Sequence, residues 1–234
     1  MLAIAALGSA CNSVFGGEGA TATPTPIPTA TLVPTPEAPD LTAFRNFSYP
    51  IEGGCLPQSE ALMPNAPREY RSGTHEGVDF YTYDNCVEIT AETPVLSAKD
   101  GRVVRADLDY RPLTQAELDG FDARIAAGED PNIDEFIDMF RGRQVWIDHG
   151  DGTVTRYAHL GAIARGIIEG QRVGAGTVIG TIGDSGTPES LSNPGQELHL
   201  HWEVRIGDTF LGAGLPPDEV RAIYQRLFEP LDAD

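Results

Sequence analysis

Basic residues are scarce in this sequence: its 234 residues include 16 Lys and Arg against 35 Asp and Glu, a formal net charge of −19. A surface of this sign repels the phosphates of nucleic acids and of anionic lipids. A long apolar run is also missing near the start, where the apolar stretch 1–10 is too short to cross a bilayer as a helix. The composition therefore excludes nucleic acid as an expected partner.

Cysteine is also scarce, with three residues. Cys11 ends the small, apolar stretch MLAIAALGSAC. We interpret residues 1–11 as a partial signal segment of the bacterial lipoprotein type, with Cys11 as a lipid anchor to the membrane. Leu7 lies four residues before Cys11, whereas this pattern usually has leucine three before. The alternative is a wrongly assigned start followed by a disordered tail.

The other two cysteines, Cys55 and Cys86, form an even pair. Such a pair favours a disulfide in an oxidising compartment, and the alternative is two buried free thiols. A disulfide closing a loop of this length stabilises a fold by about 3 to 4 kcal/mol in the chain-entropy model.

Proline recurs at nearly every second or third position of residues 20–40. This spacing prevents helices and sheet ladders and favours an extended polyproline II spacer. We therefore assign 12–44 as a Thr/Pro-rich linker and 45–234 as one folded domain. A solvated linker without a specific role explains the tract as well. We expect an extracytoplasmic monomer of the cell envelope, lipid-anchored or secreted.

Short β-rich runs separated by turns follow the linker. Residues 87–107 predict two strands joined as a hairpin at Lys99-Asp100-Gly101, and residues 143–160 predict another hairpin around Gly150-Asp151-Gly152. Further strands are expected in 171–183 and 198–206. The pattern predicts a mostly antiparallel β sandwich or open barrel.

Two segments have a helical pattern instead. An insertion at about 108–142 contains two capping-box signatures, Thr114 with Glu117 and Asn132 with Glu135. Between Asp107 and Arg141 ten acidic and three basic residues give a net charge of −7, so we interpret the insertion as a surface excursion. Residues 215–230 predict a C-terminal helix, since apolar side chains recur there with a helical period: Val220, Ile223, Tyr224 and Leu227.

The stretch HEGVD at 75–79 is close to the helical zinc motif H-E-x-x-H. Gly77 and the β-branched and aromatic residues that follow disfavour a helix. In a straight strand His75 and Asp79 would lie about 13 Å apart, too far for one metal ion. If both bind, the chain turns between them, with His75 on a loop and Asp79 at the start of a strand. Glu76 then points elsewhere; alternatively, the stretch holds no metal.

The stretch ELHLHWEV at 197–204 favours a metal site over the alternative in which HEGVD holds no metal. In a strand, His199 and His201 share one face, and Leu200 and Trp202 face the opposite side. Burying two histidines together is costly unless a metal ion or hydrogen bonds compensate. The alternative is a histidine pair on an exposed strand face.

The two remaining histidines are weaker candidates. In TRYAHL, strand alternation places His159 on the same face as Tyr157, where a lone histidine is usually a satisfied polar residue. His149 precedes Gly150 and is interpreted as a turn residue without chemistry.

Taken in order, these segments resemble the zinc endopeptidases of the lysostaphin and LytM type, peptidase family M23. The resemblance covers about residues 70–207, interrupted by the acidic insertion, and is carried by HEGVDF, TPVLSAKDGRVV, VWIDHGDGTVTRYAHL, QRVGAGTVIGTIGDSGT and LHLHWEV. It implies a LytM-type β fold for 45–234.

The resemblance also implies roles for five residues. His75, Asp79 and His201 match the ligands of one Zn²⁺ per chain, which leaves the fourth tetrahedral position open for water. His199 matches the general base, and His159 matches the histidine that orients the water or stabilises the oxyanion. Zinc would polarise the scissile carbonyl and lower the pKa of the water.

The implied function is hydrolysis of peptide bonds in bacterial peptidoglycan. Two departures concern substrate preference. Gln196-Glu197-Leu198 follows Gly195 where the family commonly has glycine just before the H-x-H strand, and the loop 184–197 is long and is expected, with the acidic insertion, to reshape the groove. One alternative is a metal-free scaffold that binds cell wall or activates another hydrolase, although such members usually lose ligand residues. Another is a structural zinc, which a set of three ligands including Asp suits less well than a closed Cys-rich set.

Overall fold

The computed structural model describes residues 44–230. The expected signal segment 1–11 and nearly all of the expected linker 12–44 lie outside these residues, and both assignments stay predictions. Among the described helices, none combines the length and the apolar character that a membrane span requires.

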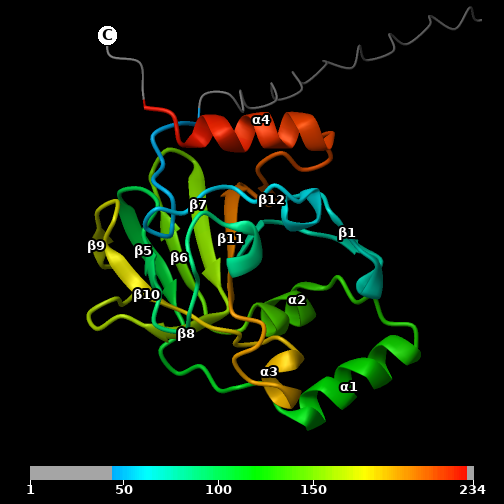
Figure 1. Cartoon of the computed structure of the whole chain (residues 1–234). Helices are drawn as coiled ribbons and strands as arrows, with labels where there is room; N and C mark the ends of the chain where they lie inside the picture. Colours follow the sequence, from blue (N-terminus) through cyan, green and yellow to red (C-terminus); the bar gives the residue numbers. More distant parts are fainter. Residues whose placement is uncertain (1–43, 231–234) are drawn as a thin grey trace, which may run out of the picture. The chain divides into compact units, whose positions relative to one another are not determined.

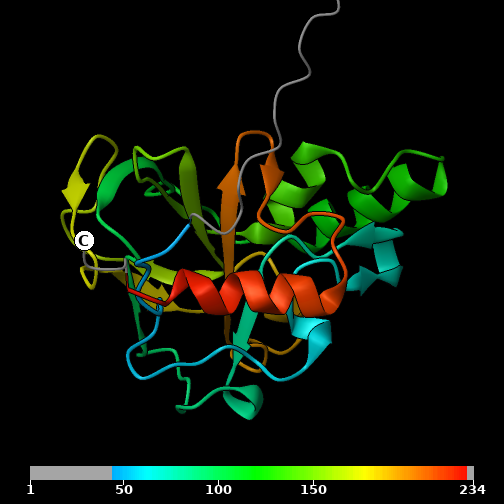
Figure 2. The same cartoon turned by 90° about the horizontal axis from the view of Figure 1, so that it is seen from above.

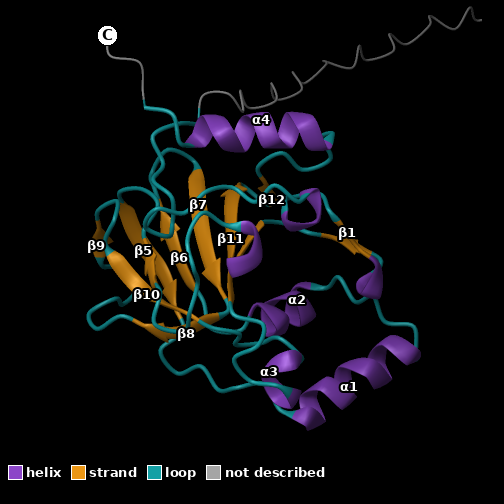
Figure 3. Ribbon diagram, viewed as in Figure 1, coloured by secondary structure: helices purple, strands orange, loops and turns teal. Residues whose placement is uncertain are grey.

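The described residues form three antiparallel sheets and four α-helices (Figures 1 and 3). The strands are β1 (Pro67–Arg68), β2 (Gly73–Thr74), β3 (Val78–Tyr81), β4 (Pro94–Leu96), β5 (Gly101–Ala106), β6 (Val145–Asp148), β7 (Thr153–Ala158), β8 (Leu160–Ile163), β9 (Arg172–Val173), β10 (Val178–Ile182), β11 (His199–Ile206) and β12 (Thr209–Phe210). The helices are α1 (Gln115–Ala126), α2 (Asp134–Arg141), α3 (Glu189–Ser192) and α4 (Pro217–Leu227).

The largest sheet has the order β12-β11-β7-β6-β5-β9. Along the edge of β11 opposite β7, β3 pairs with the first half of β11 and β12 pairs with its end. The register sets His201 opposite Asp79 and His199 opposite Tyr81. This pairing brings two segments more than a hundred residues apart into one site.

The second sheet, β4-β10-β8, shares a hydrophobic core with the first. The core includes Val95 and Ile179 from the smaller sheet and Tyr157 and Trp202 from the larger one, all fully buried. Nowhere in residues 44–230 do the sheets close into a barrel. The prediction of a mostly antiparallel β fold with a helical insertion and a C-terminal helix is confirmed.

The two predicted hairpins had different outcomes. β6 and β7 pair around the turn at Gly150-Asp151-Gly152, as expected. The prediction of a hairpin at Lys99-Asp100-Gly101 was wrong, because β4 pairs with β10 while β5 pairs with β6 and β9. This turn carries the chain from one sheet to the other, and Asp100 is fixed there by accepting a hydrogen bond from the backbone of Ala175 (2.7 Å).

The insertion contains both expected helices, but only one expected capping box. Thr114 and Glu117 form theirs at the start of α1. Asn132 does not cap α2, whose N-cap is Ile133. The side chain of Asn132 instead accepts a hydrogen bond from Arg71 (2.6 Å) and donates one to the Arg71 carbonyl (3.0 Å). A contact with a distant segment has replaced the local cap.

The C-terminal helix α4 buries the four apolar residues expected from its period: Val220, Ile223, Tyr224 and Leu227. It lies at the opposite end of the larger sheet from α1, α2 and α3 (Figure 1), and Figure 2, seen from the α4 end, shows it in front of the strands. The predicted disulfide between Cys55 and Cys86 is present, with Cα atoms 5.5 Å apart. It closes the loop that contains the HEGVD stretch.

Candidate active site

The HEGVD stretch is a bent connection between two strands. His75 follows β2, and Asp79 is the second residue of β3, so the chain turns between them as expected. Gly77 occupies the bend, where an added Cβ atom would lie 2.5 Å from the Trp202 carbonyl oxygen. Only glycine lets this loop approach β11 so closely.

Three donor atoms meet where the bend faces β11. His75 Nε2 lies 3.0 Å from Asp79 Oδ1 and 3.1 Å from His201 Nδ1, and the last two atoms are 2.7 Å apart. All three residues are buried. This is the single group of candidate metal-binding side chains found in residues 44–230. Donor atoms of a tetrahedral zinc site lie about 3.3 Å apart, so the spacing is close to what zinc requires.

Hydrogen bonds behind the two histidines decide which nitrogen faces the group. His75 Nδ1 lies 3.0 Å from the Met63 carbonyl oxygen, which can only accept, so the Nδ1–H donates and Nε2 presents its lone pair. His201 Nε2 lies 3.0 Å from Glu203 Oε1 and donates to it, which leaves Nδ1 as the inner atom. Such outer partners commonly orient metal-ligating histidines. The residues therefore fit a zinc ion.

The electrostatics of the group favour a positive charge. Burial lowers the pKa of His201, but hydrogen bonds with Asp79 and Glu203 outweigh burial and raise it to about 9. Burial raises the pKa of Asp79, but His75 and His201 outweigh it and hold this pKa well below its usual range. Arg68 donates to the second oxygen of Asp79 at 2.9 Å and so fixes the plane of the carboxylate. The group therefore attracts a cation, whether a proton or a metal ion.

His199 shares a face of β11 with His201, as the alternation predicted. Its Nδ1–H donates to the Glu197 carbonyl oxygen at 2.7 Å, which leaves Nε2 free to accept a proton. Burial lowers the pKa of His199, so the ring is neutral at pH 7. A neutral imidazole with a free nitrogen can act as a general base.

His159 reaches the site by a route that strand alternation did not predict. β7 ends at Ala158, and His159 has a left-handed backbone with φ of 58°. This conformation is uncommon for residues other than glycine and turns the side chain away from the face of the buried Tyr157. The ring centroid of His159 lies 4.5 Å from that of His199, and its Nδ1–H donates to the Ser185 carbonyl oxygen at 2.9 Å. The expectation that His159 and Tyr157 share a strand face was wrong.

His149 remains outside this group, as expected. It follows β6 at a turn, where its ring contacts the Asp100 carbonyl oxygen (2.8 Å) and the Thr155 hydroxyl (2.9 Å). These contacts satisfy both ring nitrogens.

A groove of about 770 Å³ surrounds the four clustered histidines. Its lining includes Leu62, Tyr81 and Tyr83, together with residues of the insertion and of the 184–197 loop. The insertion contributes mainly apolar side chains to it: Leu118, Phe121, Ile137 and Phe140. The insertion is therefore part of the groove wall.

Sequence reasoning also missed the residues that support the site from behind. Arg68, Tyr81 and Glu203 contact candidate site residues directly. For Glu203 the sequence did contain a signal: this residue lies two positions after His201 and therefore falls on the same strand face. The other two come from β1 and β3, and their contacts depend on how these segments pack.

The fold and the site together define a mostly antiparallel β protein with a buried His-Asp-His group and two further histidines beside it. Residues 122–212 match the model of peptidase family M23. This match confirms the resemblance expected from the motifs and supports a peptidase function. The matched segment contains His159, His199 and His201, and His75 and Asp79 precede it.

Solved structures similar to this chain include three of bacterial proteins. One is Csd3 from Helicobacter pylori (19% identity, TM-score 0.39, 70% of this chain and 31% of that one). Another is a zinc-containing peptidase from Vibrio cholerae (24% identity, TM-score 0.43, 74% of this chain and 41% of that one). The third is the catalytic domain of lysostaphin, described as an antimicrobial peptidase, from Staphylococcus simulans (20% identity, TM-score 0.38, 77% of this chain and 95% of that one). This chain thus spans less than half the length of the first two. Among curated protein sequences, none matches it.

Proposed function

We propose that this protein is a zinc-dependent endopeptidase that hydrolyses peptide bonds in bacterial peptidoglycan. The observation that carries the proposal is the convergence of His75 Nε2, Asp79 Oδ1 and His201 Nδ1 within 3.1 Å of one another. Two lone pairs and a carboxylate oxygen directed at one point repel each other unless a cation lies between them. With two more histidines beside them, the arrangement suits hydrolysis.

His75, Asp79 and His201 would hold one zinc ion per chain. When bound, zinc supplies a Lewis acid that polarises the scissile carbonyl and lowers the pKa of water. His199 takes the proton of the attacking water at its free Nε2. His159, whose Nδ1–H is engaged by Ser185, offers its own Nε2 to orient this water.

The substrate is assigned from the family resemblance and from the groove. A groove of about 770 Å³ has enough volume for several residues of a peptide. The Cys55–Cys86 disulfide supports an extracytoplasmic location, because disulfides persist in oxidising compartments. We further propose that the domain works in the cell envelope as a monomer, lipid-anchored at Cys11 or secreted, without a nucleic-acid partner.

The alternative is a scaffold without catalysis that binds cell wall or activates another hydrolase. Complete retention of the donor group and of both neighbouring histidines favours the enzyme. The test is to measure the zinc content of the full-length protein and to digest purified peptidoglycan with it, identifying released fragments by mass spectrometry. About one zinc per chain with new peptide ends supports the proposal. Stoichiometric absence of zinc, or zinc without cleavage, contradicts it.

A further inference from the structure

Glu203 continues the row of site residues on one face of β11, two positions after His201. It is fully buried, and its Oε1 accepts the hydrogen bond from His201 Nε2 at 3.0 Å. This bond directs His201 Nδ1 toward His75 and Asp79. Any group that fixes Glu203 Oε1 therefore also fixes a candidate metal ligand.

Arg141, the last residue of α2, is the group that fixes this oxygen. Its Nε donates to Glu203 Oε1 at 2.6 Å, and the residue is 8% exposed. Two other arginines approach Glu203, but they face its second oxygen, Oε2: Arg205 at 3.3 Å and Arg156 at 3.5 Å. The oxygen that holds His201 is thus held in turn by the insertion.

Arg141 also contacts the segments that carry His75 and His159. Its Nη2 donates to Glu76 Oε2 at 2.7 Å, and Glu76 directly follows His75. Its carbonyl oxygen accepts a hydrogen bond from the backbone N–H of His159 at 2.9 Å. Glu76, expected to have no role, therefore connects the His75 loop to α2. One residue of the insertion links three segments of the site.

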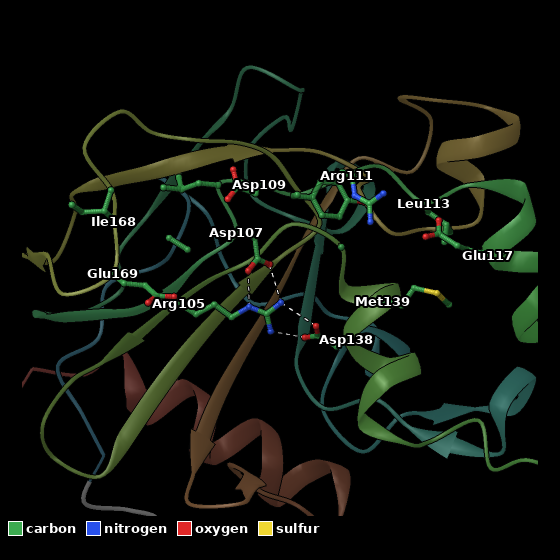
Figure 4. A pocket seen from close by; sticks show the side chains of 14 residues that line it. Arg105, Asp107, Asp109, Arg111, Leu113, Glu117, Asp138, Met139, Ile168 and Glu169 are labelled. Atoms are coloured by element: carbon green, nitrogen blue, oxygen red, sulfur yellow. Dashed lines mark hydrogen bonds and ion pairs between the residues drawn. The ribbon is translucent and has the colours of Figure 1, made fainter.

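The position of Arg141 is fixed because α2 is anchored to the larger sheet. Figure 4 shows Arg105 of β5 between Asp107 and Asp138, and both oxygens of Asp138, a residue of α2, accept from its guanidinium (2.6 and 3.0 Å). Gly142 caps the C-terminal end of the helix, and an added Cβ atom there would lie 2.1 Å from the Ser185 carbonyl oxygen. The end of α2 is therefore held on both sides.

We propose that Arg141 is a positioning residue through which the acidic insertion completes the metal centre. It fixes His201 through Glu203, and it shares with Arg205 (2.6 Å) the contact that holds Glu76 of the His75 loop. The inference rests on the proposed zinc site and adds that the insertion is required to form it. A purely structural ion cluster predicts a different result: removing Arg141 would lower stability but leave the zinc affinity of the folded protein unchanged.

The test compares the full-length protein with Arg141→Met and a matched control, Arg124→Met. Arg124 forms ion pairs with Glu129 and Glu135 inside the insertion. Zinc affinity is measured by competition with a chromophoric chelator, and circular dichroism checks that each variant is folded. We expect Arg141→Met to lower zinc affinity by about 10-fold, the lower end of the effect of losing an outer partner of a metal ligand, because Arg141 acts on His201 through Glu203. Arg124→Met should keep the parent affinity.

The visible spectrum of Co²⁺ bound in place of zinc gives a second readout. We expect it to change in Arg141→Met and to match the parent in Arg124→Met, because it reports ligand geometry rather than stability. If folded Arg141→Met keeps the parent affinity and spectrum, the inference is wrong. Equal loss in both variants also overturns it, since damage to the insertion as a whole would then explain the result.

Two further outcomes are decisive. If Arg141→Met does not fold, Arg141→Lys replaces it: one ammonium group cannot reproduce the forked contact with both Glu76 and Glu203. Reduced zinc affinity in Arg141→Lys supports the inference, and parent affinity overturns it.

If the parent protein itself binds no zinc, the proposed function fails together with this inference. If the parent binds zinc and only the variant result is contrary, the proposed function stands.

Discussion

The ring of Tyr81 is stacked on the imidazole of His199, with centroids 4.3 Å apart and an angle of 11° between the planes. The two residues are directly opposite each other in the pairing of β3 with β11. The stack and the hydrogen bond from His199 Nδ1 to the Glu197 carbonyl oxygen restrain the same ring. The proposed general base is therefore held in one orientation before substrate binds.

The first prediction concerns this stack. A general base contributes about 10²- to 10⁴-fold to the rate, so a loosened His199 in Tyr81→Ala should lower kcat by at least about tenfold. Zinc content should stay unchanged, because Tyr81 is not one of the three donor residues. Tyr81→Phe keeps the ring and should retain most of the activity in steady-state assays. Equal impairment of both variants would instead assign the effect to the hydroxyl, which donates to Glu197 at 3.3 Å.

The second prediction separates the two histidines of the H-x-H strand. His199→Ala should abolish peptidoglycan cleavage and leave zinc bound, because its nitrogens lie outside the donor group. His201→Ala should lose the metal, since it removes one of the three donors. Metal analysis of both purified variants makes the comparison. The reverse pattern would show that the two roles are exchanged.

The third prediction concerns removal of the metal. Dialysis against a chelator should abolish cleavage, and Zn²⁺ should restore it while Mg²⁺ should not, since histidine donors suit zinc and oxygen donors suit magnesium. The measurement is release of peptide fragments from purified peptidoglycan before and after each addition. Cleavage that survives complete metal removal would be incompatible with the proposed mechanism.

The fourth prediction concerns the Cys55–Cys86 disulfide. Mass spectrometry of the non-reduced, digested protein should detect the two residues in one linked peptide pair. Because the bridged residues are 31 apart, a variant with both changed to Ser should lose about 3 to 4 kcal/mol in free energy of unfolding. Denaturant unfolding of parent and variant measures this difference. Two thiols that react with an alkylating agent in the native protein would exclude the bridge in solution.

Local patterns in the sequence predicted local structure well. The alternation in LHLHWEV predicted the two faces of β11, and the helical period at 215–230 predicted the buried side of α4. Each pattern succeeded because neighbouring residues alone decide which side chains share a face. The bend in HEGVD was predictable for a similar reason: Gly77 and the residues after it disfavour a helix, and a straight strand holds His75 and Asp79 too far apart for one metal ion.

Patterns that depend on distant partners were predicted wrongly or missed. Asp100-Gly101 has the composition of a hairpin turn, but the strand pairing of β4 and β5 was decided by other strands. Asn132 resembles a helix cap, but Arg71 offers its side chain better partners. His159 was assigned to a regular strand, whereas its left-handed backbone is stabilised by contacts with Arg141 and Ser185.

The sequence by itself determined the residue types of the site, the strand that carries His199 and His201, and the bend that carries His75 and Asp79. Only the tertiary structure decided what surrounds them: Tyr81 against His199, and Arg141 of the insertion against Glu203 and Glu76. The physical reason is the distance along the sequence over which each kind of interaction acts. Backbone geometry over a few residues fixes which side chains point together, whereas the partner of a buried charge depends on which segments pack there.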